Sequence, residues 1–405
     1  MCIRDSPNTS QIPILEIIRR NIEECISLTQ LEKKLSSKKQ LLIKYGVDVT
    51  APFLHLGHAV NLWMMRTFQE YGHKVIFLIG DFTTKIGDPT GRDTQRKLLS
   101  DEEMKLNAQE FIRQVSLVLL TDPEVFSIRR NSEWYDKMAL SEFIELTSMV
   151  THAKLIQRDM FQKRIENHRE IFMHEMLYPL LQGYDSVMLK SDLTIVGSDQ
   201  LFNELMGRFY QERFGQEPQI VITSRITPGI DGREKQSKSI GNYIALIDSP
   251  REKFGKIMSI PDALIIPYLE VYTDVPEEQI QKCRDALSQN FNPMDIKKFT
   301  ANKVVARYHG EALAHEEQSW FENTFSKQKI PEDALFFLSV RSGQSLFDTL
   351  HEKLPEYSKT ALRQLVVGGG IRINGNKVDL TTIITYTPHA GDIIKVGKRK
   401  WFQIK

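Results

Sequence analysis

The 405-residue chain has few cysteines, no long apolar run and no excess of either charge. Its three cysteines, Cys2, Cys25 and Cys283, lie far apart and form no CxxC pair, which argues against a structural zinc site or a disulfide framework and is typical of a reducing cytosol. No apolar stretch approaches the roughly 20 residues of a membrane-spanning helix. The N-terminus also lacks a secretory pattern. We therefore expect a cytoplasmic protein with no membrane segment.

The charges of the chain almost cancel, with 53 basic and 52 acidic residues and a net charge of +1. A nearly neutral protein binds nucleic acid only through a local basic patch. The sequence offers one at its end, where residues 339–405 contain 11 lysines and arginines against five acidic residues. With 41% hydrophobic residues, the chain is long enough for two or three domains that each have a core.

Short apolar runs alternate with helical patterns over the first 240 residues. A helical pattern over 12–35 comes first, and Ser100 with Glu103 forms a capping-box signal for a later helix. This alternation predicts a parallel sheet covered by helices on both faces, with ligands at the carboxyl ends of the strands. Residues 250–325 are predicted to be helical. The predicted strands are 41–47, 75–79, 125–128, 193–196 and 219–222.

A His-Leu-Gly-His sequence follows the first predicted strand and opens the next helix. His55 and His58 are three residues apart and therefore share one side of the first turn. Gly57 between them lets a flat ring approach the backbone. The free N–H groups and the positive dipole end of a helix suit a phosphate, and imidazoles can donate to a phosphoryl group as its charge develops. The alternative is a helix cap with a surface histidine, which the position directly after a strand disfavours.

A basic motif, Lys235-Gln236-Ser237-Lys238-Ser239, lies just past the last predicted strand. Two lysines in a flexible loop can hold a pyrophosphate leaving group as mobile point charges. Alone, the motif would be interpreted as a solvated basic loop. Its combination with the histidine motif, about 180 residues upstream, favours phosphate chemistry.

Polar residues that could bind a small molecule occur in two further places. Tyr178, Gln182 and Asp185 are spaced i, i+4 and i+7, so they share one helix face, although a plain polar face is the alternative. Asp199 follows a predicted strand and could accept hydrogen bonds from ribose hydroxyls, while Gly197 permits close backbone approach.

Together the two motifs resemble the HIGH and KMSKS signatures of the class I aminoacyl-tRNA synthetases. The resemblance implies a Rossmann-like parallel-sheet catalytic domain, activation of an amino acid by ATP and transfer to tRNA. It assigns His55 and His58 to the ATP phosphates, Thr50 to the γ-phosphate side, and Lys235 and Lys238 to the leaving pyrophosphate. Mg²⁺ is expected to arrive with ATP and not to occupy a dedicated protein cage.

Residues from about 33 to 405 resemble the bacterial-type tyrosyl-tRNA synthetases, which implies L-tyrosine and tRNA(Tyr) as substrates. The resemblance assigns the substrate ammonium group to Asp88, Tyr178 and Gln182, the phenol to Asp185, and the neighbourhood of the substrate carboxylate to Gln200. It also implies a homodimer with part of residues 120–165 at the interface. The other assignments are Gly46, near tyrosine, and the ATP-side residues Gly57, Gly197, Asp199, Asp48, Arg92 and Arg96.

Two positions depart from the family pattern. Lys44 occupies the place where the best-known members have a tyrosine that also bonds the substrate hydroxyl, so the predicted specificity depends on Asp185. The tryptophanyl enzyme, the nearest relative within the class, is the main competitor for the catalytic half. Gln236 replaces the usual methionine, which predicts altered loop packing and not a loss of chemistry.

The C-terminal segment combines a basic helix with a Gly-rich turn and a hairpin signal at Asn374-Gly375. It resembles the small α+β RNA-binding domain first named from a ribosomal small-subunit protein, which the bacterial tyrosyl enzyme carries and the tryptophanyl enzyme typically does not. A charged domain without a ligand is the alternative. The candidates for contacts to the RNA backbone are Lys359, Arg363, Arg372, Lys377, Lys398, Arg399 and Lys400.

The sequence thus predicts four parts and leaves two other functions open. The parts are an N-terminal helical segment (1–32), the catalytic domain (33–240), a helical anticodon-side domain (241–335) and the RNA-binding domain (340–405). One open function is an RNA-binding protein that has lost catalysis. The other is a nucleotidyltransferase of the same fold that does not use tRNA.

Overall fold

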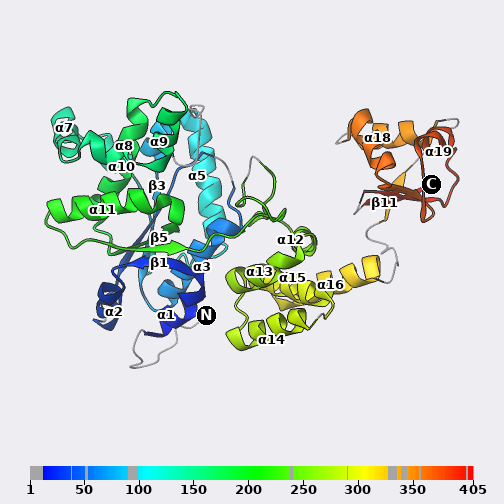
Figure 1. The fold of residues 1–405 in the computed structure, drawn as a ribbon, viewed down its shortest axis with the longest axis horizontal. Coiled ribbons are helices and arrows are strands. Elements are labelled where there is room, and N and C mark those ends of the chain that lie inside the picture. Colours follow the sequence, from blue (N-terminus) through cyan, green and yellow to red (C-terminus); the bar gives the residue numbers. More distant parts are fainter. Residues whose placement is uncertain are drawn as a thin grey trace. The chain divides into compact units, whose positions relative to one another are not determined.

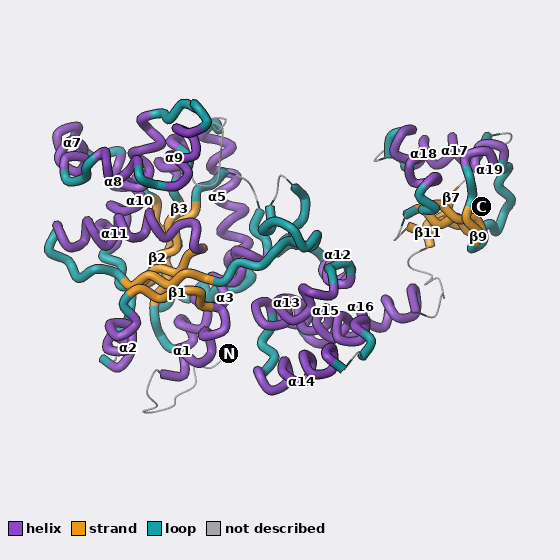
Figure 2. The backbone as a smooth tube through the Cα atoms, in the orientation of Figure 1, coloured by secondary structure: helices purple, strands orange, loops and turns teal. Residues whose placement is uncertain are grey.

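The computed structural model forms two compact units, residues 1–314 and 315–405 (Figure 1). Each unit is described by itself. Helices dominate the first unit around a central sheet, and a second sheet lies in the C-terminal unit (Figure 2). The structure describes residues 12–37, 39–50, 53–89, 99–237, 240–289, 291–326, 335–338, 344–354, 357–397 and 400–404.

The first unit is built on a six-stranded sheet with the order β1-β6-β5-β2-β3-β4. Five strands are parallel, as predicted, and β1 pairs antiparallel with β6 at one edge. The chain order reverses between β2 and β5, whose ladder contains only the pairs Ile43–Leu193 and Lys44–Thr194. Past Lys44 the two strands separate and leave room for a ligand at their carboxyl ends. The strands are β1 (Ile22–Ile26), β2 (Leu42–Val47), β3 (Lys74–Ile79), β4 (Phe126–Arg130), β5 (Leu193–Gly197) and β6 (Ile220–Ser224).

The predicted helix over residues 12–35 is wrong. The segment instead forms α1 (Ile12–Ile18), strand β1 and α2 (Leu28–Ser36). Pairing with β6 supplies hydrogen bonds to the backbone of β1, and Ser27, with a φ of 71°, separates the strand from α2. Tertiary pairing therefore overrides a helical apolar pattern here.

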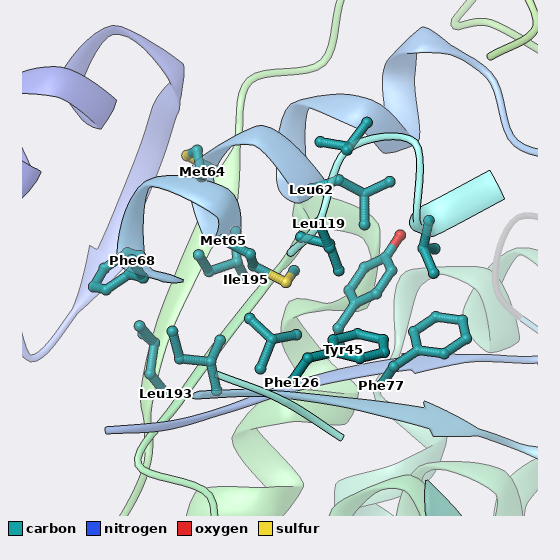
Figure 3. Packing of buried hydrophobic residues seen from close by; sticks show 14 of the residues in the cluster. Tyr45, Leu62, Met64, Met65, Phe68, Phe77, Leu119, Phe126, Leu193 and Ile195 are labelled. Carbon is teal, nitrogen blue, oxygen red and sulfur yellow. The ribbon is translucent and has the colours of Figure 1, made fainter. Parts of the chain in front are cut away.

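Helices cover both faces of the sheet, and the alternation of side chains assigns each strand residue to one face. On one face, α3 shares a core with Tyr45, Phe77 and Ile195 (Figure 3). Helices α1, α2 and α5 contribute side chains to the same core. On the other face, Ile76 and Leu78 contact α10. Ser100 and Glu103 form the predicted capping box of α5. These helices and the shorter ones between them are α3 (Leu56–Glu70), α4 (Asp81–Ile86), α5 (Asp101–Val115), α6 (Ser132–Tyr135), α7 (Leu140–Ser148), α8 (His152–Ile156), α9 (Asp159–Glu166), α10 (Met173–Leu189) and α11 (Leu201–Arg213).

Residues 250–321 are helical, as predicted, and belong to the first unit up to residue 314. The indole of Trp63 in α3 donates to the Tyr308 hydroxyl at 3.0 Å, which ties this helical region to the sheet. The helices are α12 (Pro250–Met258), α13 (Ile265–Tyr272), α14 (Glu277–Ser288), α15 (Pro293–His309) and α16 (Glu311–Phe321).

The C-terminal unit has its own core and a five-stranded sheet with the order β7-β11-β10-β8-β9. Asn374 and Gly375 both have positive φ, 48° and 87°, which is the backbone of the hairpin turn that the Asn-Gly pair predicts. Within the described residues of the whole chain, no helix is long and apolar enough to cross a membrane. The elements are β7 (Leu335–Leu338), α17 (Leu346–Lys353), α18 (Lys359–Val367), β8 (Ile371–Ile373), β9 (Asn376–Lys377), α19 (Leu380–Thr385), β10 (Ile393–Val396) and β11 (Lys400–Ile404).

Candidate active site

A cavity of about 350 Å³ opens where β2 and β5 separate. It brings together residues from both sequence motifs and from the polar face of α10, although nearly 200 residues of sequence separate the first from the last. Lys238, Arg92 and Arg96 lie outside the described residues. The predicted residues that line the cavity are Gly46, Asp48, Thr50, His55, Gly57, His58, Asp88, Tyr178, Gln182, Asp185, Gly197, Asp199, Gln200 and Lys235.

The two histidines form the N-terminal cap of α3. The backbone N–H of Gly57 donates to Nδ1 of His55 at 3.2 Å, and the N–H of His55 donates to Nδ1 of His58 at 3.3 Å. An Nδ1 that accepts a hydrogen bond carries no proton, so the proton of each neutral ring lies on Nε2. The two histidines can therefore cap the helix and also bind phosphate. The cap uses Nδ1 of each ring as an acceptor, which leaves the Nε2 proton of each ring to donate to a phosphate oxygen.

Lys235 lines the cavity and contacts Asp199. Its Nζ lies 2.9 Å from a carboxylate oxygen of Asp199, at the start of the helix that follows β5. Both side chains are exposed to solvent, so this ion pair is weak and can exchange for a nucleotide. A Cβ on Gly197 would lie 2.7 Å from a side-chain oxygen of Asp199, so a larger residue at this position would require the Asp199 carboxylate to move.

The glutamine of the basic motif anchors the loop to the helical region. Gln236 is buried, its Nε2 donates to the Tyr272 hydroxyl at 2.7 Å, and its Oε1 accepts from the N–H of Ile244 at 3.3 Å. The Tyr272 hydroxyl also bonds Thr227. In this chain Gln236 makes a polar contact with α13, and the predicted change in loop packing relative to methionine stays a prediction.

Several polar residues that line the cavity are connected by hydrogen bonds. The Tyr178 hydroxyl donates to Asp48 at 3.0 Å, and Thr83 donates to the other Asp48 oxygen at 2.9 Å. Gln200 donates to Asp88 at 2.8 Å. These contacts hold Tyr178 and Asp88, which the family resemblance assigns to the substrate ammonium group.

Asp185 is a buried carboxylate at the end of this network. The indole of Trp134 donates to it at 3.1 Å and the amide of Asn131 at 3.4 Å. Burial raises the pKa of Asp185 to about 7, and the positive charge of Lys44 is the largest influence in the opposite direction. The carboxyl group therefore changes charge near neutral pH, where it can switch between accepting and donating a hydrogen bond.

Lys44 is buried and forms an ion pair with Glu204 of α11, with Nζ and Oε2 2.8 Å apart. The sequence analysis did not identify Glu204, nor Asn131 and Trp134. A lysine in an apolar strand signals that an acidic partner exists, because a buried charge is seldom left alone. Only the tertiary structure identifies which acid it is.

Comparisons with known proteins agree with this geometry. Residues 36–326 match the family model described as tRNA synthetases class I (W and Y). The chain is 42% identical to the tyrosine–tRNA ligase of Thermotoga maritima, over 96% of each chain, and 42% identical to that of Aquifex aeolicus, over 96% of this chain and 98% of the relative. The chain belongs to the tyrosyl-tRNA synthetase family.

Solved structures of the family share the fold. A C-terminally truncated mitochondrial tyrosyl-tRNA synthetase from Aspergillus nidulans superposes with a TM-score of 0.65 at 23% identity, covering 80% of this chain and 96% of that one. The enzyme from Archaeoglobus fulgidus, solved with L-tyrosine, gives a TM-score of 0.58 at 20% identity, covering 76% and 99%. At these identities the likeness shows the fold alone.

A basic surface in the C-terminal unit completes the candidate sites of this family member. Arg372 of β8 is opposite Lys377 of β9 and Lys395 of β10, so three cations share one face of the sheet. Lys359 and Arg363 are exposed, four residues apart on α18. Lys400 is half-buried beside the Tyr357 ring, while Lys398 and Arg399 lie outside the described residues. The sequence analysis missed Lys395, which the pairing of β10 with β8 places beside Arg372.

Proposed function

We propose that the chain is a tyrosine–tRNA ligase that converts L-tyrosine and ATP to tyrosyl-adenylate and pyrophosphate, then transfers tyrosine to the 3′ end of tRNA(Tyr). The observation that carries the proposal is the convergence of both motifs and the polar face of α10 on one cavity. The full-length likeness to tyrosine–tRNA ligases supports the choice of amino acid.

The residues divide the cavity between the two substrates. His55 and His58 donate from Nε2 to the phosphates of ATP, with Thr50 on the γ-phosphate side, as charge develops at the reacting phosphorus. Lys235 leaves Asp199 and, with Lys238, Arg92 and Arg96, holds the pyrophosphate. Asp199 then accepts from the ribose hydroxyls, and Gly57, Gly197 and Asp48 complete the ATP side.

Tyrosine occupies the α10 side of the cavity. Asp88, Tyr178 and Gln182 surround its ammonium group, Gln200 lies near its carboxylate, and ionised Asp185 accepts the phenol hydrogen bond. Gly46 leaves space for the ring. Catalysis is then positioning plus electrostatic stabilisation, without a covalent enzyme intermediate.

We further propose that Mg²⁺ arrives with ATP. Within the described residues, no group of three or more His, Cys, Asp or Glu side chains is arranged to hold a metal ion. Removal of Mg²⁺ by EDTA is expected to abolish adenylate formation without changing the folded state, which circular dichroism measures.

We infer a homodimer with part of residues 120–165 at its interface. The exposed apolar side chains Leu140 and Ile144 support this assignment, because they are four residues apart on α7 and form an apolar patch on one face of the helix. The cytoplasmic location expected from the sequence is consistent with a role in translation and stays a prediction. The proposed RNA contacts are Lys359, Arg363, Arg372, Lys377, Lys398, Arg399 and Lys400, to which the structure adds Lys395.

The test is amino-acid-dependent exchange of pyrophosphate into ATP with each of the 20 amino acids and no tRNA. Exchange with tyrosine alone is expected. Exchange with tryptophan instead would contradict the proposed role of Asp185. The absence of exchange with every amino acid would favour an RNA-binding protein that has lost catalysis, and exchange without tRNA charging would favour a nucleotidyltransferase.

A further inference from the structure

The buried ion pair between Lys44 of β2 and Glu204 of α11 lines the cavity beside the proposed tyrosine site. Both side chains are 2% exposed. Removing two charges from water costs so much free energy that well-packed apolar residues often stabilise a fold equally well. Stability alone is therefore a weak reason for this pair, and its neighbours suggest a different role.

The ammonium group of Lys44 is held by acceptors of the protein. This group has three N–H donors, and three acceptors surround it: Glu204 Oε2 at 2.8 Å, Ser186 Oγ at 2.8 Å and the backbone oxygen of Gln182 at 3.5 Å. All three partners belong to α10 or α11, so Lys44 holds these helices against the sheet at the last residue of β2 that pairs with β5.

Glu204 fixes the side-chain amide of Gln182. The side-chain Nε2 of Gln182 donates to Glu204 Oε1 at 2.9 Å. The side-chain Nδ2 of Asn203 donates to the side-chain oxygen Oε1 of Gln182, also at 2.9 Å. Gln219 donates to the other Glu204 oxygen at 2.8 Å. The amide can therefore adopt only one of its two orientations, with a carbonyl lone pair remaining for the ammonium group of a substrate.

The hydrogen bonds continue from this amide toward the other proposed ligands of the ammonium group. Asn203 also donates to Gln200 at 3.0 Å, and Gln200 donates to Asp88 at 2.8 Å. Displacing the Glu204 side chain is thus expected to change the position of the Asp88 side chain as well as that of Gln182.

The positive charge of Lys44 also acts on Asp185, which lies about one helical turn after Gln182 in α10. Lys44 from β2 and Tyr135 from α6 are the titratable groups that affect the Asp185 carboxyl, and Asn131 and Trp134 supply neutral donors. Burial raises the pKa of Tyr135 well above its ordinary value, so Tyr135 stays neutral. Lys44 is therefore the cation that favours the ionised form of Asp185.

We propose that Lys44 and Glu204 are positioning residues that set tyrosine specificity. Glu204 orients Gln182 for the substrate ammonium group, and the charge of Lys44 keeps Asp185 an acceptor for the phenol. This inference rests on the proposed function, because it requires tyrosine in the cavity.

The decisive variant removes both charges, as Lys44→Met with Glu204→Gln, so that neither partner is left buried and unpaired. In pyrophosphate exchange, kcat/KM for tyrosine is expected to fall at least ~tenfold, while the KM for ATP changes less than about twofold. The acid limb of the pH profile of kcat/KM for tyrosine should move to higher pH, because Asp185 loses its stabilising cation. A purely structural role would not move that limb.

A matched control removes the ion pair between Lys34 and Asp192, as Lys34→Met with Asp192→Asn. Those side chains are 2.6 Å apart and lie beside the amino ends of β2 and β5, at the opposite edge of the same sheet. The control should retain both the tyrosine KM and the pH profile of the wild-type protein.

The variant Glu204→Asp separates the orientation of Gln182 from the effect of the Lys44 charge on Asp185. It keeps a buried carboxylate opposite Lys44, so neither charge is left unpaired and the protein is expected to fold. The shorter side chain cannot hold Lys44, Gln182 and Gln219 together, so the KM for tyrosine is expected to rise while the acid limb stays in place. An unchanged tyrosine KM in Glu204→Asp, or an unmoved acid limb in the folded double variant, would overturn the inference alone. Absence of tyrosine-dependent exchange by the wild-type protein would overturn the proposed function and this inference together.

Discussion

At the scale of single residues, the proposed site depends on buried polar groups whose charge the surroundings set. Asp185 is the clearest case, because its burial disfavours the charge that its proposed role requires. Its helix position and carboxylate made it a candidate from sequence. The donors that hold it, Asn131 and Trp134, come from residues more than 50 positions away.

Replacement of Asp185 by asparagine is expected to reduce discrimination between tyrosine and phenylalanine at least ~tenfold, because a charged acceptor for the phenol is lost. ATP affinity should change far less. The measurement is pyrophosphate exchange with each amino acid. Equal losses for tyrosine and ATP would contradict the assignment of Asp185 as the residue that recognises the hydroxyl.

The same substitution is expected to stabilise the protein at pH 8. The pKa of Asp185 is about 7 in the folded protein and higher than in the unfolded chain, so ionisation favours the unfolded state. The free-energy cost of ionising Asp185 in the folded protein is absent below the pKa that this carboxyl has in the unfolded chain, and it is fully developed above pH 7. Asp185→Asn should therefore raise the free energy of unfolding by about 1–3 kcal/mol at pH 8, and the difference should vanish as the pH approaches 4. Urea denaturation of the variant and the wild-type protein at pH 8 and pH 4 measures this difference in the free energy of unfolding. The same difference at both pH values would argue against a raised pKa of Asp185.

At the scale of elements, the strands and helices around the cavity were mostly predictable. The apolar runs and the capping box located β2, β3, β5, β6 and α5 to within a few residues. Residues 12–35 were not predictable, because β1 is formed by pairing with β6, almost 200 residues away. The hydrogen bond from Gln236 of the basic loop to Tyr272 of α13 is also a long-range contact that the sequence did not predict.

Tyr272→Phe removes the hydroxyl that holds Gln236. We expect a several-fold fall in kcat for pyrophosphate exchange, because the loop carrying Lys235 loses an anchor, and an unchanged dissociation constant for tyrosine. Tyr210→Phe is the control, since the Tyr210 hydroxyl is buried and donates to Leu146 outside the cavity. Equal effects of the two substitutions would indicate a general loss of stability.

At the scale of the whole molecule, the two compact units have separate cores. The cavity belongs entirely to residues 44–236 of the first unit, whereas the row formed by Arg372, Lys377 and Lys395 belongs to the second. Because β7 pairs with β11, a truncation that removes the C-terminal sheet as a whole must begin before residue 335. The predicted four-part division of the chain stays a prediction.

Truncation after Ser326 is expected to spare tyrosine-dependent pyrophosphate exchange and to lower tRNA charging strongly, because the basic row supplies backbone contacts to RNA. The full-length Arg372→Glu/Lys377→Glu variant should have the same effect on charging while keeping the domain. Charging at several salt concentrations is the measurement. Unchanged charging by the double variant would show that this surface does not contact tRNA.

The sequence by itself determined the alternation that produces the parallel sheet, because apolar periodicity is a local property of the chain. Its two motifs carried the resemblance to the family, and that resemblance identified many of the residues that line the cavity. Only the tertiary structure decided how those residues are held. It selected Glu204 as the partner of Lys44, placed Trp134 and Asn131 against Asp185, and made a strand of residues 22–26. The physical reason is that a buried charge or an edge strand requires a partner, and nothing local to the chain specifies which distant residue supplies it.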